Sequence, residues 1–471
     1  MKALGWIGAL LGLGLALYLA FHFSSYFTDV SFLGGLLLLE LLAASLWKFK
    51  ERFFVLLMIA FVWASMSVPL QGTWTVARWV VLSAGATVGF LVWTTIPRRS
   101  FGSLHLIAFF CISAAFVSAS VSPFVQMASF KALSLSLLFL YCATGGRLAV
   151  LGREERFFSG LVSGCEIAVC FTVVCYFVLG AEIWGNPNSL GAAMSIGVFP
   201  VLLWAWLAND QPTMKLRRLV SLLLCAYLIF FSGARAGIVC MIIITLTLGL
   251  CLRQYKMLVK VAALAVFLIV INGMFAPENL DQRLTVMKDA ALYKGHKQSG
   301  ILGSRRTPWQ MTITSIKEHP LFGTGYGTSP TGEDPGLSFG KVASSAETAR
   351  EHGSSYLTIA EWVGLLGLLP FVALLSLTAS NVWKVCSWMR RTADPRDYSI
   401  PLAMVVLSGL VHATFEDWLF AVGAYPCVYF WVFAFLLADF VPSADAVPLP
   451  GLASSTYRPP AAAFGAVLPN R

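Results

Sequence analysis

A histidine with a carboxylate just before it stands at the start of a long apolar stretch. His352 follows Glu351 in the sequence AREHGSSY, and the apolar run that begins near Ser355 is long enough to cross a membrane. An imidazole can take up a proton near neutral pH, and a neighbouring carboxylate can orient it. A single histidine can also be a purely structural hydrogen-bonding group. Glu351 and His352 are therefore candidates for a general base and its orienting partner.

Three arginines could provide an anion site on the same side of the chain. Arg235 lies in SGARAG between two apolar runs, and Arg305 and Arg306 precede Trp309 in GSRRTPW. Guanidinium groups offer planar bidentate donors to phosphate oxygens, so converging arginines would hold a diphosphate. Two alternatives stay open: Arg235 could extend to lipid headgroups, and the other two could belong to a solvated loop.

Further polar residues occur at the ends of apolar runs or within them. His412 and Glu416 in LVHATFEDWLF are four residues apart and could share one helix face. They could be metal ligands, but no third ligand is evident, so no metal site is expected. Glu361 lies inside an apolar run, where a carboxylate is a functional candidate or the partner of a neighbouring helix.

Two turns rich in Gly, Asn and Pro accompany these residues. Asn188 in WGNPNSLG could bind a sugar hydroxyl or cap the following helix. The stretch PLFGTGYGTSP (320–330) has glycines that could expose backbone amides to a phosphate. It lacks the Lys-Ser/Thr of a P-loop, which favours a structural turn beside the site.

The elements that carry these residues are expected to be membrane helices. Of the 471 residues, 58% are hydrophobic and 12% are charged, whereas soluble domains carry about a quarter of charged residues. The sequence therefore predicts an all-α polytopic membrane protein of about 12–14 spans. The expected spans cover roughly 3–21, 30–47, 53–70, 79–96, 103–121, 124–143, 157–180, 190–208, 219–232, 236–252, 257–276, 355–378, 399–416 and 418–440.

The distribution of basic residues predicts the orientation of these spans. Lys and Arg cluster in alternate connections, while the connections 22–29 and 181–189 contain none. The positive-inside rule then places both termini in the cytoplasm and the segment 277–354 on the outer side. The net charge of +10 is thus a signal of membrane topology, and no nucleic-acid partner is expected. The ten cysteines include no CxxC pair, so neither a disulfide framework nor a zinc site is indicated.

The chain divides into five regions by these criteria. The segment 277–354 is too long for an ordinary connection and has helix-compatible stretches at 281–293 and 307–319. The tail beyond residue 440 is rich in Pro and Ala and is expected to be disordered. The regions are N-terminal helices (1–156), central helices with the Arg235 turn (157–276), a large outer loop (277–354), C-terminal helices (355–440) and a cytoplasmic tail (441–471).

The order of the motifs resembles one known family. GNPNSLGAA, SGARAG, RRTPW running into HPLFGTGYGT, and HGSSYLTIAEWVGLLGLLPF resemble the O-antigen ligase and O-antigen polymerase superfamily of bacterial inner-membrane glycosyltransferases. The likeness covers roughly residues 180–420, and the order of the motifs is more specific than any one of them. This chain has Gly353 where the family usually has Asn, and its motif is one residue longer.

The resemblance implies a GT-C-like, metal-independent enzyme without a cofactor, in the inner membrane with its active site facing the periplasm. The donor would be a glycan on undecaprenyl diphosphate, and the acceptor lipid A-core (a ligase) or a growing glycan (a polymerase). His352, oriented by Glu351, would be the base. The remaining candidates would bind substrate: Arg235, Arg305, Arg306, Asn188, Tyr356 and His412. A transporter or flippase of lipid-linked sugars is the rival class, but it predicts internal repeats that the sequence does not show. A membrane scaffold would give the long outer loop no role.

Overall fold

The computed structural model describes residues 41–42, 52–67, 69, 71–95, 101–261, 263, 303–328 and 351–442. These residues form helices joined by turns and contain no strand. The expected span 3–21, most of 30–47 and of 257–276, the expected helix 281–293 and the tail beyond residue 442 lie outside them. The elements are α4 (Phe53–Ser65), α5 (Gln71–Thr95), α6 (Ser103–Ser120), α7 (Val125–Tyr141), η1 (Cys142–Gly146), α8 (Arg147–Val150), α9 (Glu154–Val173), η2 (Val174–Val178), α10 (Pro187–Ala192), η3 (Ala193–Val198), α11 (Phe199–Leu207), α12 (Pro212–Phe231), α13 (Arg235–Cys251), α16 (Gly303–Glu318), α18 (Ser355–Thr392), α19 (Ser399–His412) and α20 (Tyr425–Phe440).

The expected class of an all-α polytopic membrane protein is confirmed. Within the described residues, six helical stretches are long and apolar enough to cross a membrane. Four shorter apolar helices accompany them: α4, α13, α19 and α20. The six long stretches are Gln71–Thr95, Ser103–Ser120, Val125–Val150, Glu154–Val178, Pro187–Leu207 and Ser355–Thr392.

The helix boundaries follow several expected spans closely and differ at others. Helices α5 and α12 begin eight and seven residues before the starts expected at 79 and 219, and α20 begins seven residues after the start expected at 418. The helix expected at 307–319 begins earlier and is α16, Gly303–Glu318. The span expected at 355–378 continues to Thr392 in α18, because no Gly or Pro interrupts the polar and amphipathic sequence after Leu377. The last turn of α18 carries Arg390 and Arg391, whose positive charges suit a helix C-terminus.

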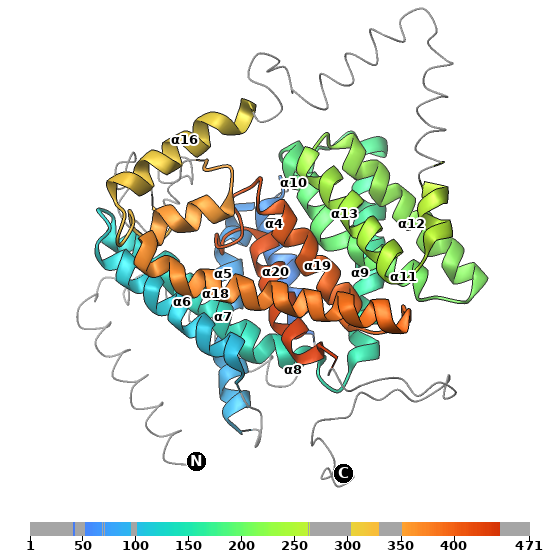
Figure 1. The fold of residues 1–471 in the computed structure, drawn as a ribbon, viewed down its shortest axis with the longest axis horizontal. Helices are drawn as coiled ribbons and strands as arrows, with labels where there is room; N and C mark the ends of the chain where they lie inside the picture. The colour runs from blue at the N-terminus through green and yellow to red at the C-terminus, as the bar shows by residue number, and fades with distance from the viewer. Residues whose placement is uncertain are drawn as a thin grey trace, which may run out of the picture.

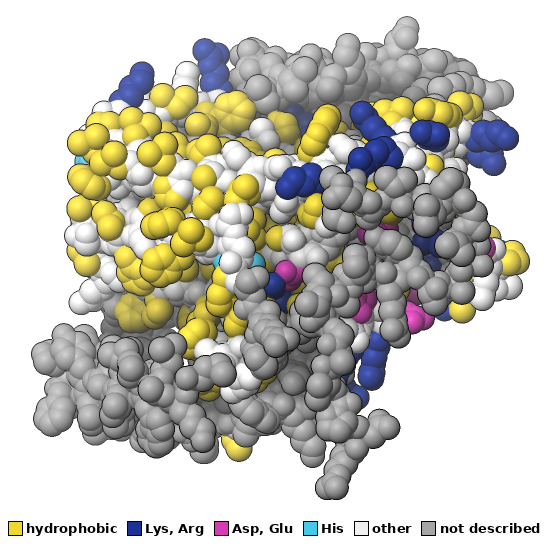
Figure 2. Space-filling model, turned by 60° about the horizontal axis from the view of Figure 1, so that its bottom comes forward, with side chains coloured by type: hydrophobic (Ala, Val, Ile, Leu, Met, Phe, Trp, Pro, Cys, Tyr) yellow, Lys and Arg dark blue, Asp and Glu magenta, His cyan; other side chains and the backbone are white. Residues whose placement is uncertain are grey.

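The helices form a bundle with two distinct ends (Figure 1). The beginning of α10 and α16 lie at one end, and α8 lies at the other. We call these the α16 end and the α8 end. Helix α20 runs through the centre, and its residues from Tyr425 to Leu437 are all buried. Hydrophobic side chains cover much of the face in Figure 2, whereas Lys and Arg lie mainly along its upper and right parts.

Helix α18 is broken near its first third. Gly364 has φ 63° and ψ −178°, which no helical residue adopts. The segment 320–325 inserts here. Four hydrogen bonds with its backbone replace the two helical bonds that would join residue 365 to 361 and residue 366 to 362. A Cβ atom on Gly364 would lie 2.5 Å from the backbone of that segment. The replacing bonds run from Leu365 N to Pro320 O (2.8 Å), from Leu366 N to Leu321 O (3.2 Å), from Thr324 N to Glu361 O (3.0 Å) and from Gly325 N to Trp362 O (3.2 Å).

This insertion explains the glycine-rich stretch of the sequence. A Cβ atom on Gly323 would lie 2.3 Å from the carbonyl oxygen of Trp362, so only glycine fits there. Further along, the hydroxyl of Tyr326 donates to the carbonyl of Phe420 at 2.9 Å. The stretch is thus a structural turn that satisfies backbone groups within the bundle, where water is scarce.

Candidate active site

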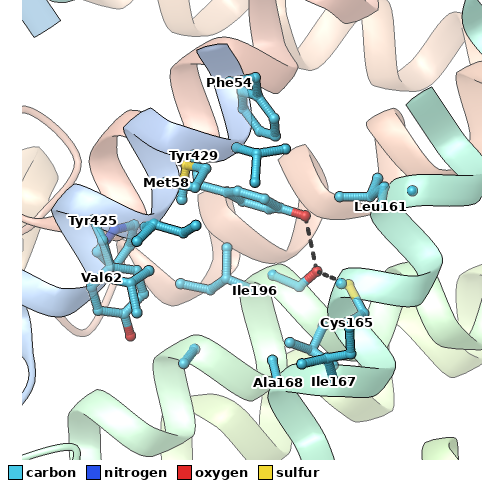
Figure 3. Close-up of a pocket in the computed structure, with 18 of the residues that line it drawn as sticks. Phe54, Met58, Val62, Leu161, Cys165, Ile167, Ala168, Ile196, Tyr425 and Tyr429 are labelled. Atoms are coloured by element: carbon cyan, nitrogen blue, oxygen red, sulfur yellow. Dashed lines mark hydrogen bonds between the residues drawn. The ribbon is translucent and has the colours of Figure 1, made fainter. Parts of the chain in front are cut away.

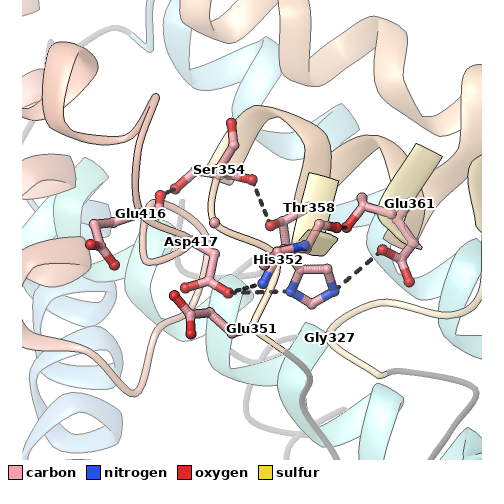
Figure 4. Close-up of polar contacts among 12 residues, drawn as sticks. Gly327, Glu351, His352, Ser354, Thr358, Glu361, Glu416 and Asp417 are labelled. Atoms are coloured by element: carbon pink, nitrogen blue, oxygen red, sulfur yellow. Dashed lines mark hydrogen bonds and ion pairs between the residues drawn. The ribbon is translucent and has the colours of Figure 1, made fainter. Parts of the chain in front are cut away.

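His352 lies between two carboxylates at the α16 end of the bundle (Figure 4). Its Nδ1 is 3.2 Å from Oδ2 of Asp417, and the same oxygen accepts a hydrogen bond from the backbone amide of His352 at 3.0 Å. Its Nε2 is 3.3 Å from Oε2 of Glu361. The edge of its ring meets the ring of Trp362, with centroids 5.9 Å apart. Both ring nitrogens are therefore engaged by acidic groups of the protein.

The side chains of His352, Asp417 and Glu361, which we call the trio, differ in their exposure to solvent. The side chains of His352 and Glu361 are 1% and 0% exposed, whereas that of Asp417 is 30% exposed. Asp417 is thus the member of the trio that a molecule outside the protein can reach. Glu361 is inside α18, three residues before the break, so its position depends on that local unwinding.

The pKa values of His352 and Asp417 are shifted in opposite directions, so that each residue stabilises the charged form of the other. Burial alone lowers the pKa of His352, but the hydrogen bond to Asp417 and the nearby carboxyl group of Glu361 outweigh this effect and raise the pKa above 6.5. Burial would raise the pKa of Asp417, but the hydrogen bonds from His352 hold it below 3.8. The imidazolium form of His352 therefore persists to higher pH than in a free histidine.

Arg305 of α16 forms a second charged group beside the first. Its Nη1 donates to Oε1 of Glu351 at 2.5 Å, and its Nη2 donates to Oε1 of Glu416. The amide of Asn188 also donates to this oxygen of Glu416, at 3.3 Å. Glu416 is partly buried, and burial raises its pKa although Arg305 opposes this. Residues far apart in the sequence thus meet around one guanidinium group.

The turn between α19 and α20 joins these two groups. Glu416 contacts Arg305, and the next residue, Asp417, contacts His352. The turn is fixed to the first residue of α18, since the hydroxyl of Ser355 donates to the carbonyl of Glu416 at 2.6 Å and accepts from the amide of Leu419 at 3.0 Å. The cation and the imidazole are therefore held at a defined separation by neighbouring residues of one turn.

Gly353 permits the close approach of α16 to His352. It has φ +69°, a conformation that residues with a side chain rarely adopt. Its carbonyl accepts a hydrogen bond from Nε1 of Trp309 at 3.0 Å. A Cβ atom here would lie 3.1 Å from Cδ of Arg305 and 3.4 Å from Nε1 of Trp309. Glycine at this position thus lets Arg305 and Trp309 pack against the backbone beside His352.

The other candidates from the sequence take different positions. Arg235 is the first residue of α13, close enough to Arg305 for the two positive charges to repel each other. Arg306 is exposed on α16. The hydroxyl of Tyr356 donates to the carbonyl of Leu410 at 2.7 Å, and the buried ring of His412 accepts from Nε1 of Trp418 at 3.0 Å.

Sequence reasoning did not identify the acidic partners of the histidine. Glu351, expected to orient His352, forms its ion pair with Arg305, while Asp417 and Glu361 contact the ring. Their only signal in the sequence was that of carboxylates within or beside apolar runs. Asn188, expected to bind substrate, contacts Glu416.

One comparison with known proteins bears on this site. Residues 220–372 match the family model described as O-antigen ligase. The match includes Arg235, Arg305, His352 and Glu361, and it ends before Glu416 and Asp417. No curated protein matches the chain. The match over residues 220–372, which include these four site residues, agrees with the O-antigen ligase family that the order of the motifs predicts.

Proposed function

We propose that the protein is an inner-membrane O-antigen ligase, which transfers a glycan from undecaprenyl diphosphate to lipid A-core on the periplasmic side. The family match supports a glycosyltransferase of the ligase and polymerase type. The observation that carries the proposal is the pair Glu416 and Asp417, which holds a guanidinium group beside an acid–base group. Such a pairing suits a reaction with an anionic leaving group and a hydroxyl nucleophile.

Arg305 and Arg235 would stabilise the departing diphosphate. A lipid diphosphate leaves readily when cations neutralise the charge that develops on it, so neither ATP nor a metal is required in this mechanism. The side chain of Glu351 is 66% exposed, whereas that of Glu416 is 20% exposed. We therefore expect a diphosphate oxygen to replace Glu351 at Nη1 of Arg305, while Glu416 keeps Nη2 in place. Arg306, exposed on the same helix, would attract the anion.

The acceptor proton would pass to the pair of Asp417 and His352. Inverting transfer needs a base that takes the proton of the attacking hydroxyl, and a carboxylate serves as this base in inverting glycoside hydrolysis. Asp417 is the exposed member of the pair, and its Oδ2 is held by His352. A hydroxyl group of the acceptor would therefore contact Asp417 first. The buried His352 would control the basicity of Asp417 through its hydrogen bond to Oδ2.

A polymerase that joins lipid-linked repeat units is the alternative, because it uses the same donor and differs in the acceptor. Transfer by the purified protein in detergent, with undecaprenyl-diphosphate glycan and lipid A-core, tests the proposal directly. We expect glycan on lipid A-core, with loss of product in both Arg305→Gln and Asp417→Asn. Full activity in both variants would reject the assigned site.

Deletion in the host distinguishes the two acceptors. Uncapped lipid A-core together with polymer on its carrier is the result expected for a ligase. Single repeat units on lipid A-core would instead identify a polymerase.

A further inference from the structure

A large groove lies beside the beginning of α20, and no residue of α18 lines it. It has a volume of about 670 Å³ and is bounded by α4, α9, η3 and the beginning of α20. Figure 3 shows Met58 and Val62 of α4 facing Leu161 and Cys165 of α9 across it, with Tyr429 between them. Its rim includes exposed hydrophobic side chains, among them Val55, Ile59, Ile167 and Phe171. In a membrane this rim would face lipid.

The wall of the groove presents almost no unsatisfied polar group. The hydroxyl of Tyr429 donates to the carbonyl of Gly197 at 3.1 Å, and that of Tyr425 donates to the carbonyl of Ser189 at 2.9 Å. Nε1 of Trp184 donates to the hydroxyl of Thr172 at 3.3 Å. The polar side chains that line the middle and outer parts thus bond to the protein, and an acyl chain is the ligand that matches this surface.

Three arginines mark the α8 end of the same groove. Arg52 precedes α4, while Arg153 and Arg156 flank the start of α9, and all three are exposed. Among the described residues that line the groove, these arginines are the ones with a charged side chain, so the charged groups of this lining are positive. Glu154 and Glu155 lie between two of them in sequence, but neither lines the groove. An apolar groove with positive charges at one end is complementary to an anionic lipid, which has apolar chains and a negatively charged head group.

We infer that this groove binds an anionic glycerophospholipid, with its phosphate at Arg52, Arg153 and Arg156 and its acyl chains along α4 and α9. The donor diphosphate proposed above belongs at Arg305, at the opposite end of the bundle, so this is a second lipid site. The basic residues attract the anionic head group, and the apolar wall holds the chains. The inference does not depend on the transfer reaction.

Native mass spectrometry of the full-length protein from nanodiscs tests the site. The nanodiscs contain phosphatidylglycerol and phosphatidylethanolamine in equal amounts, and retained lipids are counted. We expect phosphatidylglycerol to be enriched about tenfold on the unmodified protein, which is roughly what 1.4 kcal/mol provides. The double variant Arg153→Gln, Arg156→Gln should abolish the enrichment.

A matched control removes two charges elsewhere. Arg217 and Arg396 are exposed and pair with Glu166 and Asp210, and neither lines the groove. The variant Arg217→Gln, Arg396→Gln should keep the enrichment. Equal loss in both double variants, or equal retention of the two lipids by the unmodified protein, would overturn the site.

A second pair of variants tests the groove itself. A Cβ atom on Gly164, which lines the groove, would meet no atom within 4 Å, so Gly164→Leu adds a side chain without a clash at Cβ. It should lower retained phosphatidylglycerol at least fivefold, while Gly72→Leu, equally open but outside the groove, should not. Unchanged retention in Gly164→Leu would contradict the inference. So would retention of undecaprenyl phosphate in place of phosphatidylglycerol, since that would assign the groove to the carrier.

Discussion

Asp417 holds His352 through a single carboxylate oxygen, which contacts both the backbone amide at 3.0 Å and ring Nδ1 at 3.2 Å. This double contact fixes the carboxylate against the histidine, while the side chain of Asp417 as a whole remains 30% exposed. The histidine is almost fully buried, so the carboxylate is the part of the pair that can meet a substrate.

The variant Asp417→Asn tests this division of roles. An amide can still accept the hydrogen bond from the backbone of His352, but it cannot take a proton. We expect the rate of transfer to fall about 10²-fold or more, with a smaller effect on the KM for the donor. Initial rates of the purified protein measure this. Asp210→Asn, which changes an exposed carboxylate paired with Arg396, should keep the full rate. A rate near that of the unmodified protein in Asp417→Asn would exclude Asp417 as the base.

The pH dependence of transfer reports on His352. Because the pKa of His352 is raised above 6.5, the imidazolium persists to higher pH than in a free histidine, and its positive charge weakens Asp417 as a base. Loss of its proton strengthens the base, so the rate should rise as pH increases through this raised pKa. Glu361→Gln removes one of the groups that raise the pKa of His352, so the rising part of the pH–rate profile should move to lower pH. A rate that falls with pH over this range, or a rising part that moves to higher pH in Glu361→Gln, would show that the imidazolium is the active form.

Arg305→Gln should weaken donor binding more than it disturbs folding. The change removes the cation that joins Glu351 and Glu416 and leaves two carboxylates facing the donor diphosphate. We expect the KM for the donor to rise at least tenfold, and Arg305→Lys to recover little of this, since a single ammonium cannot reproduce the planar fork. Lys317→Gln near the end of the same helix is the charge-matched control. An unchanged KM in Arg305→Gln would remove Arg305 from the diphosphate site.

Gly353→Ala tests whether transfer depends on the packing of Arg305 and Trp309 against residue 353, apart from the backbone strain that the change introduces. A left-handed conformation costs a residue with a side chain about 1–2 kcal/mol, and the new methyl group would press on Arg305 and Trp309. Gly152→Ala has similar strain at φ +82° but no atom within 4 Å of its Cβ. We therefore expect similar losses of thermal stability in the two variants and reduced transfer in Gly353→Ala alone. Equal transfer activity would mean that this contact does not position Arg305.

Gly364→Ala should destabilise the fold itself. Its Cβ would lie 2.5 Å from backbone atoms of the segment 320–325, whereas that of Gly180, with the same φ of +63°, would meet nothing within 4 Å. Thermal unfolding in detergent should show a midpoint several degrees lower for Gly364→Ala than for Gly180→Ala. Equal midpoints would indicate that the segment does not support α18.

The sequence predicted the helices well because apolar length and basic clusters are local signals. The expected spans at 103–121 and 236–252 correspond to α6 and α13 within one residue at each end. The break in α18 could not be read in this way, since EWVGLLGLL has two glycines and only Gly364 takes a positive φ. It depends on a partner segment about 40 residues earlier, whose backbone replaces the lost hydrogen bonds.

The sequence predicted which types of residue form the site better than it predicted which of them contact each other. Arg305 and His352 were chosen for their chemistry, and the structure brings both to the turn that contains Glu416 and Asp417. The sequence placed Glu351 beside His352 because they are neighbours along the chain. At Gly353 the backbone turns through a positive φ, and Glu351 instead reaches Arg305. Such pairings depend on backbone direction, which composition and spacing do not encode.

The backbone junction between residues 320–325 and α18 means that the two halves of the site are anchored independently of the chain between them. Arg305 is tied to the bundle through this junction, and His352 through the start of α18. Both anchors lie in described residues, on either side of residues 329–350. A single proteolytic nick there should therefore yield two fragments that stay associated and retain transfer activity, as in a split enzyme.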